Sequence, residues 1–423
     1  VFSGVIDSDT MALGIKGTGP LRPWEIVVIF FTSAYVSISL EVTGILDFFS
    51  YKIVHKAGGN GLKLFLFFYL FSCFLTVFTS NDIVILILTP IIFYLGKHAA
   101  LNIIPLLFAE FFGANTLSML LYIGNPTNII VGNALSMGFL EYTRVMWIPT
   151  VTAGVANLVL LFVFFRKALT VKFKPHFGVG FSVRNWADAV ISCGLLLLML
   201  ATLTFSRPLG LPIWVVTSFF AGVFMAEDLA FGFYYTIKHK FLPASEIIKD
   251  EREVFRLYGI PEERHEFWIA IKRIPWKILP FTLVFFILVA ALGKLGAVDR
   301  LASLIAVYSG DLASSIAVNG ILGFISANVI NNQPMTILFS NVLISESFKI
   351  SHQAFKGGAY AVIIASNLGA NLTLFGALAG LMWRRILETK GLEISYSDFL
   401  KTGVFITPVV FILSLAALYL VLL

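Results

Sequence analysis

The sequence predicts an all-α polytopic membrane protein, organised as an inverted repeat with two re-entrant hairpins and two broken transmembrane helices. The chain has 423 residues, of which 58% are hydrophobic and only 13% are charged. About ten apolar stretches approach the roughly 20 residues that a helix needs to span the hydrocarbon core of a bilayer. Clusters of Asn, Gly and Pro interrupt these stretches in the same order in both halves. Because a spanning backbone must satisfy its polar groups internally, we expect helices rather than barrel strands.

The charge and the cysteines exclude several function classes. The net charge of +6 comes from basic residues in short loops between apolar segments, where such residues set membrane orientation. Nucleic acid is therefore excluded as a partner. Cys73 and Cys193 lie inside apolar runs, so we predict neither a disulfide framework nor a thiolate metal site, and no cofactor. No cleavable signal peptide follows Val1, and we expect a preceding segment with up to one more spanning helix.

The first repeat is predicted over residues 24–165. We expect Trp24 to Leu46 to span the membrane and residues 62–96 to form a re-entrant hairpin with the polar tip Thr79-Ser80-Asn81-Asp82. Both ends of this hairpin carry basic residues, which places them on the same side of the membrane. An irregular tip at membrane depth is tolerated only where it is buried in protein or lines a polar cavity.

A broken helix is predicted over residues 101–138. Gly124-Asn125-Pro126-Thr127-Asn128 interrupts it, and its Pro and Gly free backbone groups at membrane depth. Discontinuous helices of this kind form the midplane binding sites of secondary transporters. Met146 to Phe165 then returns across the membrane and ends at Arg166-Lys167.

Residues 166–277 are predicted to link the two repeats. They contain two transmembrane helices, Trp186 to Phe205 and Leu211 to Met225, and then a polar segment from Phe231 to Lys277. Basic residues alternate with aromatic and aliphatic residues in this segment, which favours a cytoplasmic location with interfacial amphipathic helices. A regulatory domain or an anionic-lipid site is the alternative for the same segment.

The second repeat is predicted over residues 278–423. It begins with a span from Ile278 to Leu295, followed by a hairpin over residues 313–346 with Asn331-Asn332-Gln333-Pro334 at its tip. A second broken helix, residues 354–387, is interrupted at Ser366-Asn367-Leu368-Gly369-Ala370-Asn371. Gly403 to Leu423 forms the last helix.

The two halves match in order and differ in orientation. We pair Asn125-Pro126-Thr127 with Asn371-Leu372-Thr373, and the predicted turn Glu141-x-x-Arg144 with the predicted turn Asp398-x-x-Lys401. If the hairpins do not cross, every strongly basic loop falls on one side, and the opposite side carries acidic residues: Glu141, Asp299, Asp311 and Glu346. This predicts a multi-pass protein of the cell (inner) membrane with cytoplasmic basic loops. The alternative, that the clusters are ordinary loops, would scramble this charge pattern.

Several motifs resemble the ion transporter superfamily, which holds dicarboxylate symporters, sodium/proton antiporters and arsenite pumps. Ser80-Asn81-Asp82 followed by Leu86–Pro90, together with Leu368–Thr373 and Gly376–Trp383, are most similar to the arsenite permease (ArsB-type) family. The resemblance covers nearly the whole chain from Trp24. It implies export of arsenite or antimonite driven by protons, with a soluble ATPase subunit and a homodimer as candidate partners.

Two departures from the family pattern qualify this resemblance. Dicarboxylate members are expected to carry Ser-Asn-Thr at both hairpin tips, where this chain has Ser-Asn-Asp and Asn-Asn-Gln. That difference argues against carboxylate transport. Arsenite pumps often carry an aspartate at the positions of Asn115 and Asn367, so their proton-coupling residue has no direct counterpart here.

A small neutral solute such as arsenous acid presents hydroxyl groups, so it requires amide and hydroxyl partners that both donate and accept hydrogen bonds. The polar clusters supply such groups, and the predicted substrate-binding residues are Asn81, Asn125, Thr127, Asn331, Asn332, Asn371 and Thr373. For any one of these asparagines, the alternative is that it caps a hairpin helix. Two distant cysteines cannot form a three-thiolate arsenic site.

Proton coupling requires a group whose protonation changes with access. A carboxylate at the centre of a membrane helix costs roughly 2.5 to 3.5 kcal/mol on insertion scales, so such residues are functional candidates. Asp82 at the first tip is the first candidate and Glu110 is the second, whereas Glu41 and Asp47 are expected near an interface. A structural role for Asp82, as a partner of the hairpin amides, is the alternative.

Rival functions remain open at this point. A sodium/proton antiporter or a sodium-coupled anion (dicarboxylate) transporter of the same superfamily is the alternative, because Asn and Thr side chains with freed carbonyls also bind sodium. An enzyme is not expected, since all six histidines lie in or beside predicted loops and no Gly-x-Ser-x-Gly motif is present. A channel is less compatible with inverted hairpins than an elevator-like, alternating-access transporter.

Overall fold

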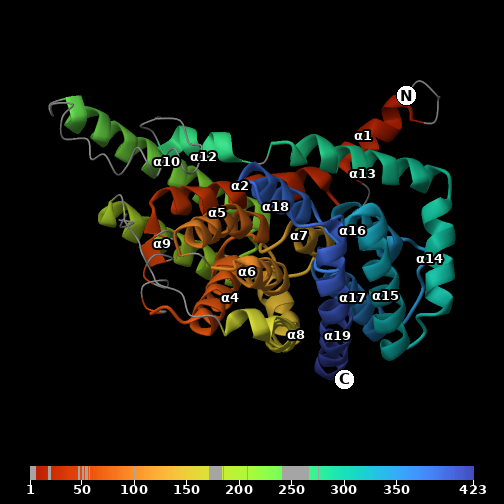
Figure 1. Ribbon diagram of the computed structural model, residues 1–423. Coiled ribbons are helices and arrows are strands. Elements are labelled where there is room, and N and C mark those ends of the chain that lie inside the picture. Colours follow the sequence, from red (N-terminus) through yellow and green to blue (C-terminus); the bar gives the residue numbers. More distant parts are fainter. Residues whose placement is uncertain are drawn as a thin grey trace.

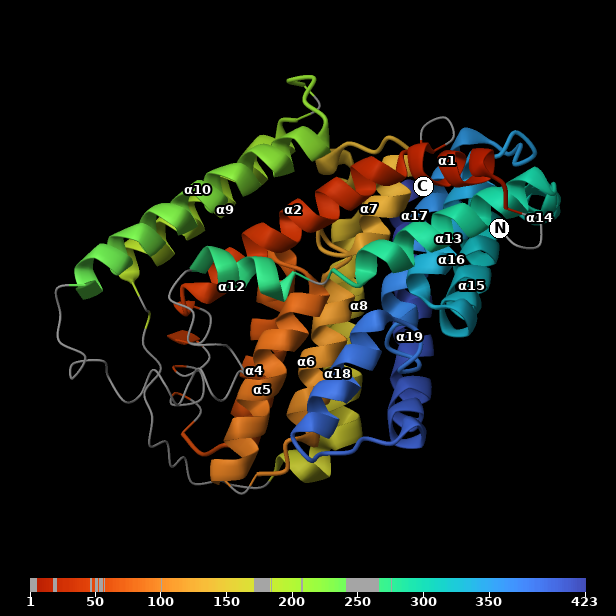
Figure 2. The same ribbon diagram turned by 90° about the horizontal axis from the view of Figure 1, so that it is seen from above.

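The computed structural model describes residues 6–17, 21–45, 48–49, 52, 56, 58–99, 101–170, 183, 185–206, 208–240, 266–274 and 276–423. The described residues form helices and connecting links, and no β-sheet is present among them (Figures 1 and 2). The predicted all-α class is therefore confirmed. Asp47 lies outside the described residues, as does most of the polar segment between α10 and α12.

The helices of the amino-terminal part are α1 (Ser8–Lys16), α2 (Pro23–Val42), α4 (Gly61–Phe78), α5 (Asn81–Ala99), α6 (Ile104–Leu117), α7 (Pro126–Ala134) and α8 (Phe139–Leu169). The linker contains α9 (Trp186–Thr204), α10 (Ile213–Lys240) and α12 (Glu266–Arg273). The carboxy-terminal part contains α13 (Ile278–Lys294), α14 (Ala297–Val307), α15 (Leu312–Ile330), α16 (Asn332–Ile344), α17 (His352–Gly369), α18 (Leu378–Thr389) and α19 (Tyr396–Leu422).

Within this described part, eight helical segments are long and apolar enough to cross a membrane. They include α4 and α15, which the sequence predicts to be the first arms of hairpins. Large apolar side chains are exposed on the outer helices, for example Val155 on α8, Leu197 on α9 and Ile412 on α19. Exposed apolar faces are stable in lipid and costly in water. The chain is therefore a multi-pass membrane protein.

Three helical features differ from the sequence prediction. Helices α1 and α14 were not predicted, because each is too short to appear as a spanning stretch. Helix α10 continues to Lys240, well beyond the predicted end at Met225. Glu141 and Asp398, predicted to lie in turns, belong to the first turns of α8 and α19. An acidic residue in the first turn of a helix is stabilised by the helix dipole.

Four helix boundaries of the amino-terminal part recur in the carboxy-terminal part at a spacing of 252 positions. Corresponding boundaries lie 252 positions apart: Val42 and Lys294 end α2 and α13, Phe78 and Ile330 end α4 and α15, Leu117 and Gly369 end α6 and α17, and Pro126 and Leu378 begin α7 and α18. Other boundaries depart from this spacing by a few positions, for example Phe139 and Tyr396, which begin α8 and α19 and lie 257 positions apart.

Helices α6 and α17 lie at the centre of the molecule. Nearly all residues of both helices are buried. Helix α6 packs against α4 and α8, and α17 packs against α15 and α19, while α8 and α19 pack against each other (Figure 1). The breaks that follow α6 and α17 therefore lie inside protein, where irregular backbone at membrane depth can be satisfied.

An aromatic cluster brings several helix ends together on one side of the molecule. The ring of Phe108, near the start of α6, lies 5.4 Å from Phe165 of α8, 5.7 Å from Trp383 of α18 and 5.5 Å from Phe399 of α19. Basic pairs follow closely in the sequence at the ends of α8 and α18: Arg166-Lys167 and Arg384-Arg385. These basic helix ends consequently share one side of the molecule.

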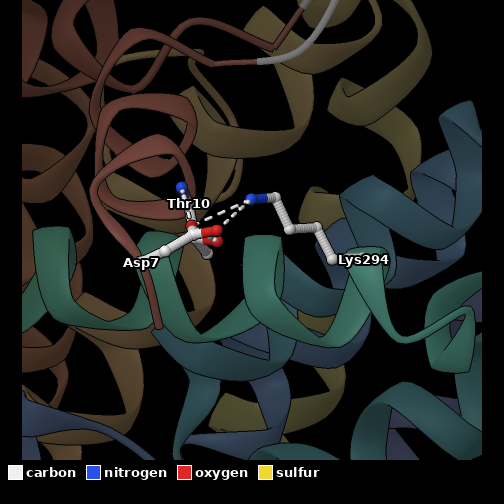
Figure 3. A network of polar contacts seen from close by, with 3 residues as sticks. All are labelled: Asp7, Thr10 and Lys294. Atoms are coloured by element: carbon white, nitrogen blue, oxygen red, sulfur yellow. Dashed lines mark hydrogen bonds and ion pairs between the residues drawn. The ribbon is translucent and has the colours of Figure 1, made fainter. Parts of the chain in front are cut away.

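Helix α1 packs along α13 (Figure 1). Gly14 permits this approach, because a Cβ at that position would lie 2.6 Å from the Cα of Ile287. Lys294 of α13 donates to the carboxylate of Asp7 at 2.9 Å, and the same carboxylate accepts from Thr10 (Figure 3). The Thr10 hydroxyl, followed by Lys294, lowers the pKa of Asp7. An exposed ion pair therefore supplements the apolar packing that holds α1.

Candidate functional site

Buried amide side chains connect the two helix breaks. The Nδ2 of Asn81, at the start of α5, donates to the Oδ1 of Asn115 at 2.8 Å. The Nδ2 of Asn115 donates in turn to the Oδ1 of Asn371 at 3.0 Å, and Asn371 donates to the hydroxyl of Thr116 at 3.2 Å. All four residues are buried. One chain of hydrogen bonds thus connects the first hairpin with both central helices.

Asn367 is a second centre of the same network. Its Oδ1 accepts from Ser118 Oγ and from Asn125 Nδ2, each at 2.9 Å. Its Nδ2 donates to the Oδ1 of Asn128 at 2.8 Å. Asn128 also donates to the carbonyls of Ser118 and Leu121, at 2.8 and 3.0 Å. Asn367 of α17 therefore pairs with three side chains in and beside the first break.

The second hairpin joins this network through a serine. Ser366 Oγ lies 3.0 Å from Thr127 Oγ1, and the carbonyl of Ser366 accepts from Asn332 Nδ2 at 3.1 Å. The network consequently contains residues from α5, α6, α7, α16 and α17 together with the breaks (network residues Asn81, Asn115, Thr116, Ser118, Asn125, Thr127, Asn128, Asn332, Ser366, Asn367 and Asn371). None of these side chains carries a formal charge.

Local sequence explains where the helices at the breaks begin. Asn125 caps α7 by accepting from the backbone N–H of Thr127 at 3.1 Å, and Pro126 follows at the first helical position. This arrangement is strongly preferred at helix N-termini. Asn331 caps α16 in the same manner, with a positive φ of 74°, a conformation that Asn tolerates better than most residues.

The structure places five of the seven predicted substrate-binding residues in the network: Asn81, Asn125, Thr127, Asn332 and Asn371. The other two form local contacts beside the second tip. Asn331 donates to the carbonyl of Phe375 at 3.0 Å, and Thr373 donates to Asn328 Oδ1 at 2.7 Å. Both are only partly buried. Their contacts resemble the capping alternative that the sequence left open.

The pairing of Asn125 with Asn371 does not match the helix positions. Asn125 caps the second segment of its broken helix, whereas Asn371 lies two residues beyond the end of the first segment of the other. At the spacing of 252 positions, Asn125 corresponds to Ala377, the N-cap of α18, and Asn115 corresponds to Asn367. The equivalent tip residues are Asn81 and Asn332, 251 positions apart. Sequence comparison alone had aligned the more conspicuous Asn-x-Thr motifs.

Glu110, the second candidate for proton coupling, lies on α6 outside the amide network. It is fully buried, and its Oε1 accepts from Thr89 of α5 at 2.8 Å. Its Oε2 has no hydrogen-bond partner among the described residues, and neither has the indole N–H of Trp383. The indole lies beside this carboxyl group. Glu110 thus connects the first hairpin, the first central helix and α18.

Asp82, the first candidate, follows Asn81 in the first turn of α5 and is 7% exposed. Thr79 and Ser80 of the same tip line a small cavity of about 10 Å³ beside Ser33, Ser37 and Pro126. A second cavity of about 10 Å³ lies next to the other tip and shares Pro126. Each volume is about that of one probe-sized water. Each of these two cavities therefore has room for about one water molecule beside a tip.

Sequence reasoning missed several members of the network. Asn128 and Ser366 stand inside clusters already recognised in the sequence, and Asn115 and Asn367 were noted only as neutral positions. The signal available was the presence of an amide two residues before the end of each first helical segment. Metal-binding groups are not indicated, since no cluster of three or more His, Cys, Asp or Glu residues in the described ranges could hold an ion.

Comparisons with known proteins identify the family. The sequence model of the CitMHS family, described as citrate transporter, matches residues 3–355. The arsenical pump membrane protein of Escherichia coli (strain K12) is 25% identical over 405 residues, covering 93% of this chain and 86% of that protein. The putative arsenical pump membrane protein of Bacillus subtilis (strain 168) is 26% identical over 419 residues, covering 97% and 89%.

A third relative carries a less specific name. The 46 kDa membrane protein of Mycobacterium leprae (strain TN) is 23% identical over 409 residues, covering 94% of this chain and 86% of that protein. These similarities confirm the expected resemblance to arsenite permeases within the ion transporter superfamily. A helical, multi-pass chain whose breaks meet at a buried amide network, and whose sequence matches one family over most of its length, belongs to the CitMHS citrate transporter family of membrane transporters.

Proposed function

We propose that this protein is a secondary active transporter that exports arsenite or antimonite in exchange for protons. The proposal rests mainly on the buried amide network, which offers donors and acceptors without a formal charge. Arsenous acid is a small neutral solute whose hydroxyl groups both donate and accept hydrogen bonds, so amide and hydroxyl side chains suit it. The names of the relatives from Escherichia coli and Bacillus subtilis support the same solute.

One acceptor at the first tip supports a solute-binding role in particular. The Oδ1 of Asn81 is buried and has no hydrogen-bond partner among the described residues. Leaving a buried polar group without a partner costs about 1–3 kcal/mol, and native structures rarely do so without reason. A hydroxyl group of the solute would satisfy this oxygen, with Asn115 and Asn371 beside it.

We further propose that the two parts form an inverted repeat with re-entrant hairpins. The four pairs of helix boundaries that lie 252 positions apart support the repeat. If α4–α5 and α15–α16 each return to the side they came from, α2, the broken helix α6–α7, α8, α9 and α10 make five crossings before the second repeat. An odd number of crossings inverts it. The site then lies between the repeats, as in other transporters of this architecture.

An elevator-like motion is the mechanism we propose for alternating access. Both hairpins and both broken helices contribute to the network, so these elements would move together against α2, α9, α10 and α13. The two cavities of about 10 Å³ beside the tips are consistent with an occluded state. Crosslinks from a hairpin to the scaffold that leave transport intact would contradict this motion.

For proton coupling we propose Asp82 as the main group and Glu110 as the second. Asp82 is the only carboxylate in the two tips and two breaks. Buried carboxylates inside membrane proteins commonly belong to proton or ion pathways. Glu110 contacts Thr89 of the first hairpin, so a change in its protonation would reach the moving elements.

The proposal is tested with purified protein in liposomes that carry a pH gradient. Wild-type protein should drive arsenite uptake into liposomes with an acidic interior, and Asp82→Asn should abolish the dependence on the gradient while the protein still folds. Glu346→Gln, which neutralises an exposed carboxylate between α16 and α17, is the matched control and should behave as wild type. Unchanged gradient-driven transport by Asp82→Asn would refute its role, and resistance assays in an arsenite-sensitive host would report the solute independently.

A second function deserves a test because of the helix termini. The N-termini of α5, α7 and α16 all reach the network through Asn81, Asn125 and Asn332. Helix N-termini bind anions, and the family is described as citrate transporter. A sodium-coupled anion transporter, or a sodium/proton antiporter, would show transport that requires sodium. Assays of citrate and arsenite with and without sodium distinguish these functions from the main proposal.

The cellular setting is part of the same proposal. The basic helix ends would face the cytoplasm of a cell whose inner membrane holds the protein. Arsenite or antimonite and protons would be its solutes, with lipid around its apolar faces. A soluble ATPase subunit and a second copy of the chain are the partners to look for by co-purification.

A further inference from the structure

A cavity of about 590 Å³ lies beside the first broken helix, outside the amide network. One wall consists of the start of α2 and the link between α9 and α10, and the other consists of the end of α7 and the link that follows it. These segments belong to the side of the molecule opposite the basic helix ends, because α6 starts in the aromatic cluster and α7 ends at the cavity. The cavity therefore opens where scaffold helices meet a broken helix.

The inner end of the cavity is close to the network. Tyr122, in the first break, lines the cavity and is itself 1% exposed. Its ring packs on the bare backbone of Gly132, where a Cβ would lie 2.2 Å from a ring carbon. Leu121, the preceding residue, accepts a hydrogen bond from Asn128 of the network at 3.0 Å. The cavity thus ends one residue away from a network contact.

A set of polar contacts spans the two walls. Glu25 of α2 accepts from the guanidinium of Arg22 at 2.9 Å and from the side-chain amide of Asn133 at 2.9 Å. The backbone N–H of Arg22 donates to the Oδ1 of Asn133 at 3.3 Å. Asn133 lies near the end of α7, so these contacts join the scaffold to the broken helix. The charges of Arg22 and Glu25 cancel, which suits passage of an uncharged solute.

We propose that this cavity is the outer port through which a small, uncharged, hydroxylated solute leaves the amide network, with the Tyr122 ring as its floor. The inference rests on the proposed function and adds the route and its side. Gly132 is the position that allows the ring to lie across the route. The Asn133 contacts hold the port in the conformation described here, and movement of α7 against α2 would break them.

Cysteine labelling tests the port. Ser136→Cys places a thiol in the cavity lining, and Leu209→Cys places one on the same side of the molecule, 61% exposed and outside the lining. Both are made in a Cys73→Ala, Cys193→Ala background, because these are the two native cysteines. Met137→Cys, a second lining position, replaces Ser136→Cys if that variant fails to fold. A membrane-impermeant cationic methanethiosulfonate reagent is added outside intact cells that are exporting arsenite.

Both cysteines should react from outside, and only the adduct at position 136 or 137 should remove most of the arsenite efflux. Labelling of a lining cysteine without loss of efflux would overturn the port, as would a lining cysteine that reacts only in inside-out vesicles. If the unlabelled Cys73→Ala, Cys193→Ala protein shows no efflux while the wild-type protein is active, the cysteine replacements are the cause. The lining and control cysteines are then introduced into the wild-type chain instead. A wild-type chain that exports no arsenite would overturn the proposed function, whereas the labelled side would still decide where the cavity opens.

Discussion

Replacing Asn367 with alanine should destabilise the protein through the groups it leaves without partners. Asn367 accepts from Ser118 Oγ and Asn125 Nδ2 and donates to Asn128 Oδ1, at 2.8 to 2.9 Å. Ser118 keeps a hydrogen bond to the carbonyl of Asn115 at 2.8 Å, so two amide groups lose a buried partner. Each orphaned group costs about 1–3 kcal/mol, whereas measured interhelical hydrogen bonds in membranes average about 0.6 kcal/mol. We therefore expect a loss of about 2 kcal/mol in the free energy of unfolding.

The assay is reversible unfolding of the purified protein in mixed micelles of a mild detergent and dodecyl sulfate. Asn341→Ala is the matched control, because the Asn341 amide donates only within its own helix, to the carbonyl of Ile337 at 2.9 Å. This control should lose less than about 1 kcal/mol. Equal losses of unfolding free energy in the two variants would refute the reasoning that contacts between α17 and the first break contribute more stability than a hydrogen bond within one helix. Full transport activity of Asn367→Ala would argue against the network as part of the solute route.

Two further perturbations address the ends of the scaffold helices. Arg273→Ala should lower the free energy of unfolding by about 2 kcal/mol, because it leaves the buried Glu41 carboxylate without the guanidinium that lies 2.6 Å away; the loss is smaller than for a fully buried pair. Adding Glu41→Gln to this variant should restore most of the lost stability in the same unfolding assay. A double variant that is no more stable than Arg273→Ala would argue against an electrostatic cause. The pKa of Asp7 is lowered by its hydrogen bond from Thr10 and its contact with Lys294. The stabilising contribution of its ionised form is therefore complete above the ordinary carboxyl pKa of about 4 and decreases as the pH falls below it. The hydrogen-exchange protection of α1, taken relative to the intrinsic amide exchange rate at each pH, should fall on acidification in wild type and be independent of this titration in Asp7→Asn. An identical pH dependence of the protection in the two proteins would exclude Asp7.

The burial of the network in the membrane explains why its side chains are uncharged. A buried charge in the membrane requires a partner or a functional reason, and amides satisfy freed backbone groups without that cost. Asn128 illustrates this, since it bonds two carbonyls of the first break and the Asn367 side chain at once. Replacing such a residue by aspartate would remove the donors that the break requires. Asn115 and Asn367, on the central helices α6 and α17, therefore combine a structural role with the proposed solute contact.

The sequence by itself determined the class of the protein and the places where its helices break. Apolar length and composition decide whether a segment enters a membrane, and these are local properties of the chain. Polar clusters such as Gly124–Asn128 also mark breaks locally, because Pro and Gly end helices and Asn caps them. The family motifs in Gly376–Trp383 are equally readable without a structure.

The tertiary structure decided which of these residues meet. Asn115 contacts Asn371, 256 positions away, and Asn367 contacts Asn125, 242 positions away; no local pattern specifies such pairs, because they depend on how α6 and α17 pack. The helix boundaries revealed the spacing of 252 positions, at which Asn125 corresponds to Ala377 rather than to Asn371. The short helices α1 and α14 likewise needed the structure, since a short amphipathic helix is stabilised by the surface it covers rather than by its own sequence.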